Sequence, residues 1–330
     1  MIQESARAFA QTEIAPFAAE WDQTARFPTE VAGRLGELGF LGMTISEEWG
    51  GAGADNVSLA VVIEEISAAD GACGLLVGLQ NSVVCAPINQ FGTDEQKKRF
   101  LRPAAKGEIR GCFCLTEPQA GSDASNLRTK ADLKGNRYLI NGSKQFISSG
   151  ASADIALIFG VTDSDAGKKG ISAFIVPTDS PGYRVVAKED KLGQRASDTC
   201  QLSFEDLEVY PDMVLGELGQ GYGIALANLE GGRIGIGAQA LGIARAAYEA
   251  ALSYAKDRES MGKAIVQHQA VGFRLADMAT KIEVARQMIW HAAALKDSGR
   301  PALKEASMAK LFATEMAEEV CSAAIQIHGG

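Results

Sequence analysis

The chain has 330 residues, of which 46% are hydrophobic and 22% are charged, proportions typical of a soluble globular protein with a large core. This length predicts about two or three domains. The formal net charge of −9 argues against a nucleic-acid partner, because phosphate backbones favour basic surfaces. An anionic small molecule would therefore depend on local basic residues.

Cysteine and histidine usage argues against a metal centre. Three histidines are present, and the six cysteines form no CxxC pair. We therefore expect buried, reduced thiols and no metal. No basic-then-apolar leader opens the sequence, and the apolar run Cys73–Leu79 is too short to cross a bilayer. These features predict a cytoplasmic protein with no membrane contact.

Residues 1–110 have a helical pattern. Ile63 and Ile66 recur at helical spacing within Val57–Ala69. Thr93 is followed three residues later by Gln96, which is the pattern of a capping box at a helix start. We expect an N-terminal helical domain over residues 1–110.

The apolar period changes to two between Gly111 and Gly216. Short strand candidates follow one another without intervening helices, and turn pairs such as Asn141-Gly142 separate them. This pattern predicts an antiparallel β-barrel over residues 111–216, and not a doubly wound sheet. The candidate strands are Gly111–Leu115, Thr129–Leu133, Arg137–Ile140, Asp154–Val161, Ile171–Val176, Tyr183–Ala187 and Cys200–Phe204.

The last third of the sequence returns to a helical pattern. Helices are predicted over Tyr222–Lys256, Ala264–Asp297 and Pro301–Ile327, and short turns between long helices favour a bundle over residues 217–330. Three helices leave a fourth bundle position open. We therefore expect an incomplete bundle in a truncated chain, and an α+β multidomain protein as a whole.

Thr116–Asp123, just after the first strand candidate, is suited to contact with a polar ligand. Pro118 fixes one backbone dihedral, and Gly121 allows the backbone to approach a ligand closely. Thr116 and Ser122 supply hydroxyl groups. Taken alone, the segment could equally be an ordinary turn.

Further motifs follow in order. They are Lys144–Ser148, Lys191–Ser197, Gly232–Gln239, Arg258–Lys263 and Gln326–Gly330. Together with Thr116–Asp123, this set resembles the acyl-CoA dehydrogenase flavoprotein family from about Ala6 onward, and its short-chain and short-branched-chain members most. The resemblance implies FAD, an acyl-CoA substrate oxidised to 2-enoyl-CoA with hydride transfer to flavin N5, an electron-transfer flavoprotein as acceptor, and a homotetramer.

The resemblance also implies site residues. The FAD contacts would be Phe113, Leu115, Thr116, Gly121, Ser122, Phe146, Ile147 and Ser148, with Arg258, Gln269, Gln326, Ile327, His328, Gly329 and Gly330 contributed by a neighbouring subunit. The substrate contacts would be Ser122, Tyr222, Glu230, Gly231, Gly232 and Arg233. The glycine pair could open space for the thioester, or could mark a tight helix crossing.

The catalytic base is not assigned. In the isovaleryl-CoA dehydrogenase branch of the family, a glutamate directly precedes the arginine that matches Arg233, and here that position is Gly232. Glu230 lies about 200° away around a helix. Most relatives carry the base in the helical region that follows the double glycine matching Gly329-Gly330. We therefore expect the base beyond Gly330. Two alternatives remain: an oxygen-using flavoenzyme of this fold, such as an acyl-CoA oxidase or monooxygenase, and a non-catalytic flavin-binding fragment.

Overall fold

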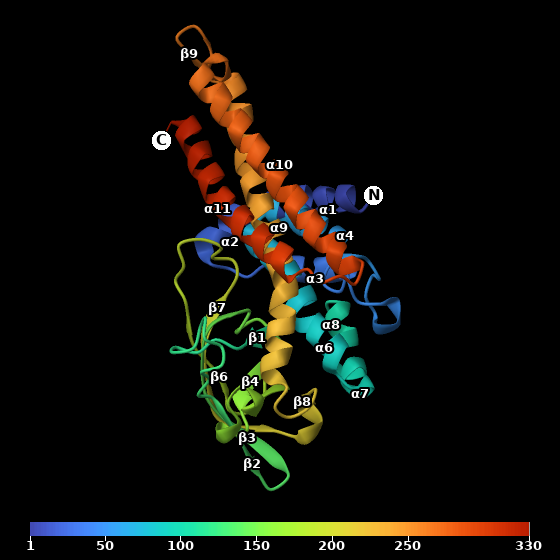
Figure 1. Ribbon diagram of the computed structural model, residues 1–330. Helices are drawn as coiled ribbons and strands as arrows, with labels where there is room; N and C mark the ends of the chain where they lie inside the picture. Colours follow the sequence, from blue (N-terminus) through green and yellow to red (C-terminus); the bar gives the residue numbers. More distant parts are fainter. Residues whose placement is uncertain (330) are drawn as a thin grey trace. The chain divides into compact units, whose positions relative to one another are not determined.

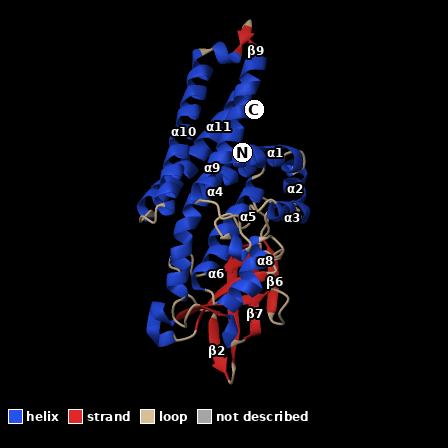
Figure 2. Ribbon diagram, turned by 90° about the vertical axis from the view of Figure 1, so that its right-hand side faces the viewer, coloured by secondary structure: helices blue, strands red, loops and turns tan. Residues whose placement is uncertain are grey.

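The computed structural model describes residues 1–329, which form two compact units. The first unit contains Met1–Ala19, Asp55–Gly78 and the chain from Glu230 onward, and the second contains Glu20–Ala54 and Leu79–Leu229. Along the sequence, helices are followed by a sheet and then by helices again (Figures 1 and 2). This order confirms the predicted fold class.

Long helices build the first unit. They are α1 (Ile2–Phe9), α4 (Asn56–Ala69), α5 (Gly71–Leu79), the part of α9 (Gly221–Asp257) after Leu229, α10 (Gln269–Asp297) and α11 (Leu303–His328). In Figure 1, α10 and α11 run side by side. Along α10, apolar residues three or four positions apart form a buried stripe: Leu275, Met278, Ile282, Ala285 and Ile289. Burial of that stripe explains why this segment packs as a bundle helix.

The predicted start of α10 at Ala264 is wrong, because α10 begins at Gln269. Residues 259–264 instead form a hairpin of β9 (Glu259–Ser260) and β10 (Lys263–Ala264). Met261 and Gly262 both have positive φ angles, of 53° and 75°. Positive φ at both turn positions matches the two-residue turns that favour hairpins, so the chain reverses direction before the helix can start.

The second unit combines short helices with one large sheet. The helices are α2 (Ala18–Thr24) from Glu20 onward, α3 (Thr29–Glu37), α6 (Ala86–Phe91), α7 (Asp94–Gln96), α8 (Arg102–Ala105) and the part of α9 up to Leu229. The strands are β1 (Gly111–Cys114), β2 (Lys130–Lys134), β3 (Arg137–Ser148), β4 (Ile155–Val161), β5 (Ile171–Pro177), β6 (Tyr183–Lys188), β7 (Thr199–Val209) and β8 (Val214–Leu215). The capping box at Thr93 and Gln96 is present, as predicted.

The sheet is mixed, so the expectation of purely antiparallel pairing is wrong at β1. The strand order is β6-β7-β3-β2-β4-β5-β8, and β1 pairs with β4 in parallel. Between β1 and β4 the chain passes through a long loop and the β2–β3 hairpin. A connection of that length allows β4 to return in the same direction as β1, which a tight hairpin could not. The other neighbours pair antiparallel, except for one parallel contact of β2 with β4.

The core of the second unit centres on β4 and β5. Every residue of Ile155–Gly160 and Ile171–Val176 is buried. These runs are almost continuously apolar, a pattern typical of strands that are covered on both faces. The sheet therefore gives a rigid base for the loops that leave its edges.

One helical segment is longer than its apolar run suggested. Gly71–Phe91 spans 21 residues with a mean hydropathy of 1.5, which satisfies the length and composition test for a membrane span. The prediction from Cys73–Leu79 alone, that the run is too short, is therefore corrected. Because 61% of the tested window is buried, the segment also fits the core helix of a soluble protein, which passes the same test.

Candidate functional site

The loop after β1 presents polar groups on the second unit. Backbone hydrogen bonds of 3.0 Å in both directions between Glu117 and Ala120 close a tight turn. Thr116 is half-buried before this turn, and Gly121 and Ser122 are exposed after it. The turn therefore holds the predicted ligand-binding residues in a defined place at the edge of the sheet.

The second predicted segment, Phe146–Ser148, lies on β3 beside this loop. The Gln145 backbone N–H donates to the Thr116 carbonyl oxygen at 2.9 Å, which joins the two segments. Phe146 has a φ of 57°, and its side chain is 62% exposed. The pairing of β3 with β7 shifts register between Lys144 and Ile147. Such a bulge turns a side chain out of its normal alternation, and strained, exposed aromatic residues are common at ligand sites.

Three hydroxyl groups around these segments are available to a ligand. The side chains of Thr116, Ser122 and Ser148 make no hydrogen bond within the described residues. Each hydroxyl can donate one hydrogen bond and accept others. With the exposed ring of Phe146, they form a set that can cover a planar molecule and bind its polar edge.

The other predicted residues of these segments are turned toward the protein interior. Phe113 packs against Phe159 with ring centroids 4.8 Å apart. Leu115 and Ile147 are buried. Their side chains support the strands, so a ligand contact by Leu115 or Ile147 would use backbone atoms.

The residues predicted to contact the FAD of a neighbouring subunit lie in the first unit, near the ends of α9, α10 and α11. Gln269 starts α10 next to the hairpin, and the Ile265 N–H donates to the Arg258 carbonyl at 2.8 Å. The ring of His328, near the end of α11, stacks on Tyr254 of α9 at 4.6 Å. In Figure 1 the hairpin labelled β9 projects at the start of α10, and α11 ends below it. Arg258, Gln269, Gln326, His328 and Gly329 are exposed, Ile327 is buried, and Gly330 lies outside the described residues.

The glycine pair of α9 has a charged neighbour. A Cβ atom on Gly231 would lie 2.6 Å from the Lys296 Nζ, so the ammonium group of α10 occupies this space. Burial lowers the pKa of Lys296, while the charges of Asp297 and Glu230 oppose that shift. Glu230 therefore lies within electrostatic reach of a cation. At Gly231 the structure shows close packing against Lys296.

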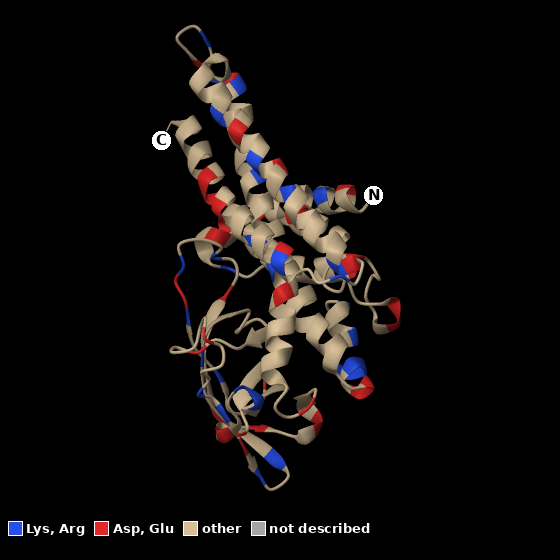
Figure 3. Cartoon of the chain, viewed as in Figure 1, with Lys and Arg blue, Asp and Glu red and all other residues tan. Residues whose placement is uncertain are grey.

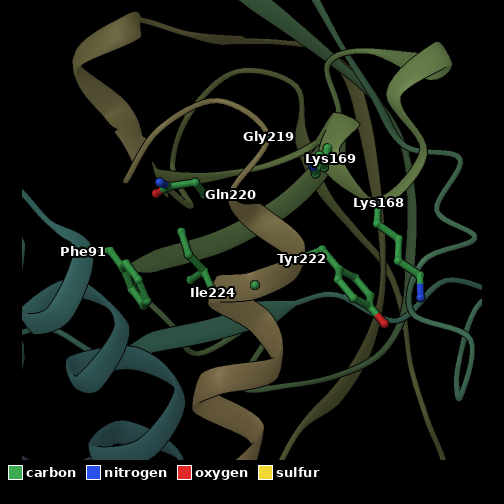
Figure 4. A pocket seen from close by; sticks show the side chains of 8 residues that line it. Phe91, Lys168, Lys169, Gly219, Gln220, Tyr222 and Ile224 are labelled. Carbon is green, nitrogen blue, oxygen red and sulfur yellow. The ribbon is translucent and has the colours of Figure 1, made fainter.

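Tyr222 lines a separate pocket of about 390 Å³ in the second unit. The Lys168 Nζ lies 5.1 Å from the centre of the Tyr222 ring. In Figure 4, Phe91 projects from α6 toward Ile224, while Tyr222 and Lys168 lie beside each other. An aromatic face next to ammonium groups can hold a planar base and an anionic group.

The two lysines of this pocket were not predicted as site residues. In the sequence, Lys169-Gly170 only marks a turn between strands, and Phe91 only closes a helix. Acidic and basic residues are interspersed along the helices and strands (Figure 3). Lys168 and Lys169 are therefore a local basic feature of an acidic chain, as an anionic ligand would need.

The thiols lie mostly in the interior. Five cysteines are buried as predicted, whereas Cys321 is only half-buried because it lies on a partly open face of α11. Burial raises the pKa of Cys85 to about 12. No cluster of three or more metal-ligating side chains occurs within residues 1–329.

Comparisons with known proteins cover the whole chain. Family models match residues 1–108 (acyl-CoA dehydrogenase, N-terminal domain), 112–207 (middle domain) and 219–330 (C-terminal domain). The sequence is 47% identical to an acyl-CoA dehydrogenase of Bacillus subtilis (strain 168), over 100% of this chain and 87% of the relative.

Two solved structures are similar in fold and sequence. One is butyryl-CoA dehydrogenase from Megasphaera elsdenii, with a TM-score of 0.98 and 40% identity over 100% of this chain and 87% of the other. The second is described as the electron transferring flavoprotein of Acidaminococcus fermentans, with a TM-score of 0.98 and 46% identity over the same shares of the two chains.

Proposed function

Because the chain belongs to the acyl-CoA dehydrogenase family, whose members are FAD-dependent oxidoreductases, we propose that it oxidises short or short-branched acyl-CoA thioesters to 2-enoyl-CoA. The hydrogen bond from Gln145 to Thr116 is the observation that carries this proposal. It joins two segments whose free hydroxyls and exposed aromatic ring suit a flavin. The similarity to butyryl-CoA dehydrogenase supports a short acyl chain.

The residues of the second unit fit the ring system of FAD, which supplies the hydride acceptor when bound. Thr116, Ser122 and Ser148 would donate to its polar edge, and Phe146 would cover an apolar face. Arg258 and Gln269, with residues 326–330, would bind the diphosphate and adenine of FAD in a neighbouring subunit. The fork of donors on arginine suits a diphosphate.

The pocket of Tyr222 and Lys168 would hold the nucleotide end of coenzyme A. The Tyr222 ring offers a stacking face, and Lys168 and Lys169 offer charges to phosphate groups. From the family resemblance, Ser122, Glu230, Gly231, Gly232 and Arg233 are proposed as further contacts of the substrate. No residue of this chain is proposed as the base that takes the α-proton. Glu230 is not proposed, because it lies about 200° around the helix from Gly232, the position that carries the glutamate in the isovaleryl-CoA dehydrogenase branch.

The test is reconstitution of the chain with FAD, followed by anaerobic titration with butyryl-CoA. We expect a protein-bound flavin spectrum, and a slow loss of flavin absorbance after butyryl-CoA is added, because this chain supplies no assigned base to take the α-proton. A protein that retains no flavin absorbance after excess FAD is removed would contradict the proposal. Rapid reoxidation of the reduced protein by air would favour the oxygen-using alternative, and binding without reduction would favour the non-catalytic one.

The nucleotide end can be tested separately with Lys168→Ala. This variant should weaken the binding of butyryl-CoA but not of butyryl-pantetheine, which lacks the phosphates. Loss of one charge-assisted contact would weaken binding on the order of tenfold. Lys134→Ala, at the exposed end of β2, is the control and should change neither affinity. An equal loss of affinity for both thioesters would show that Lys168 does not bind the phosphate groups.

The remaining features of the proposal follow from family resemblance. We propose domains over residues 1–110, 111–216 and 217–330, a homotetramer, and an electron-transfer flavoprotein as electron acceptor. We also propose a cytoplasmic location. Light scattering of the FAD-loaded protein would test the tetramer, and reduction of a purified electron-transfer flavoprotein would test the acceptor.

A further inference from the structure

A fully buried ion pair lies under the two flavin-contact segments of the second unit. The Lys144 Nζ is 2.8 Å from the Glu117 Oε1, and the two side chains are 0% and 2% exposed. Lys144 also donates to the Leu115 carbonyl oxygen at 3.1 Å. A charge pair so far from water needs several hydrogen bonds to offset its desolvation.

The Glu117 carboxylate connects both ends of the loop. It accepts hydrogen bonds from the backbone N–H groups of Arg128 at 2.6 Å and Thr129 at 3.1 Å. The Gln119 side chain donates to it at 2.7 Å. Glu117 therefore joins the start of the loop, next to Thr116, to its end, where β2 begins.

Lys144 extends the same connection to the second segment. It lies on β3 two residues before Phe146, at the point where the register of β3 and β7 shifts. Its neighbour Gln145 donates to the Thr116 carbonyl. The pair and this hydrogen bond thus hold the loop and the bulge of β3 together.

We propose that Glu117 and Lys144 are a positioning pair that sets the loop Thr116–Ser122 against Phe146–Ser148, so that both segments meet one flavin. This inference rests on the proposed FAD site. Buried ion pairs often add little net stability compared with apolar residues of similar volume. The gain from this pair is therefore expected in the geometry of the ligand site more than in the stability of the fold.

The test uses the double variant Glu117→Gln/Lys144→Met, which removes both charges and leaves neither unpaired. Thermal unfolding, FAD affinity and amide hydrogen exchange over residues 116–129 are compared with the unaltered chain. We expect a similar melting temperature, a rise in the FAD dissociation constant on the order of tenfold or more, and faster exchange in the loop. The control is Arg137→Met/Glu208→Gln, an exposed pair on β3 and β7, which should change neither.

Unchanged FAD affinity, or unchanged exchange in the loop, would overturn the positioning role. A lower melting temperature with faster exchange across the whole second unit would also overturn it, because the pair would then be a general stabiliser. If the unaltered chain fails to bind FAD, the proposed function fails. In that case, faster amide exchange over residues 116–129 in the double variant would show that the pair holds the loop in place but has no role in flavin binding.

Discussion

Single residues in this chain are constrained by close contacts that composition does not reveal. Gly242 lies in the interior of α9, where alanine would normally be favoured by about 1 kcal/mol. A Cβ atom at this position would lie 2.3 Å from the Glu64 carbonyl oxygen and 2.8 Å from the Ser67 Cβ of α4. The Glu64 backbone cannot move easily. Close packing therefore requires glycine at position 242, although alanine has the higher helix propensity.

Gly242→Ala should therefore destabilise the protein by about 1–3 kcal/mol, the usual cost of overpacking. Gly33→Ala is the matched control, because Gly33 also lies in a helix but its added Cβ would meet nothing within 4 Å. That variant should be stabilised by about 0.5–1 kcal/mol. Urea unfolding of both would measure the difference. Equal effects would show that α4 and α9 do not pack as closely as described.

Among the predicted flavin contacts, the charged side chain of Arg258 should contribute more to FAD binding than the neutral hydroxyl of Thr116. Arg258→Ala would remove a charged donor, which typically contributes about 1.5–3 kcal/mol, whereas Thr116→Ala would remove a neutral hydroxyl that contributes about 0.5–1.5 kcal/mol. Titration of the FAD-free protein should therefore show a larger loss of FAD affinity for Arg258→Ala. The opposite order would argue against the diphosphate role of Arg258.

At the scale of elements, helix ends of the first unit stabilise one another. The N-terminus of α4 is capped by Asp55, whose carboxylate accepts from the Ser58 N–H at 2.7 Å. Asp297 at the end of α10 adds a second acceptor, 2.8 Å from the Asn56 nitrogen and 3.2 Å from the Val57 nitrogen. A carboxylate at this end also interacts favourably with the helix dipole.

Asp297→Ala should lower the free energy of unfolding by about 1 kcal/mol, the usual cost of losing a helix cap. Asp277→Ala serves as the control, because Asp277 is exposed on α10 and makes no hydrogen bond among the described residues. It should change stability by less than about 0.5 kcal/mol. Chemical denaturation would compare them, and a silent Asp297→Ala would show that Asp55 is a sufficient cap.

At the scale of the whole molecule, each unit buries charged carboxylates. Glu65 of the first unit lies 2.8 Å from the Arg7 Nη2 and 2.7 Å from the Arg245 Nη2. Burial opposes its charge, but these cations and Gln3 outweigh burial and lower the pKa of Glu65. In the second unit, Lys144 and backbone donors likewise lower the pKa of Glu117 against the effect of burial.

Both shifts predict loss of stability in acid. With a lowered native pKa, the unfolded chain binds more protons than the folded chain just below the ordinary glutamate pKa of about 4.3. The stabilisation is therefore complete above that pH and decreases as the pH falls through the native pKa. Melting temperatures of Glu65→Gln should be lower than those of the unaltered chain at neutral pH but depend less on pH below about 4.3. If the melting temperatures of Glu65→Gln and of the unaltered chain fell equally steeply below about pH 4.3, the result would contradict this account.

Most helices and strands can be predicted from the local residue pattern. Exceptions are Ala264, which is predicted to begin a helix but lies in the hairpin of residues 259–264, and Asn141-Gly142, which is predicted as a turn but lies inside β3. The change of apolar period at Gly111 and again near Tyr222 reflects side-chain spacing along each element, so it can be read without tertiary contacts. The capping box at Thr93 and the buried stripe of α10 are local in the same sense. Motif order was enough to identify the family.

How these elements meet depends on contacts between residues that are far apart in the sequence. The parallel pairing of β1 with β4 depends on where the chain returns after a long excursion, which no local pattern encodes. Lys144 follows the predicted turn Asn141-Gly142, and nothing in the local sequence marks it as the partner of Glu117. Lys168 likewise lies next to a turn in the sequence and reaches Tyr222 only in the folded chain. Pairs distant in sequence are chosen by packing and desolvation, which act only once the chain is folded.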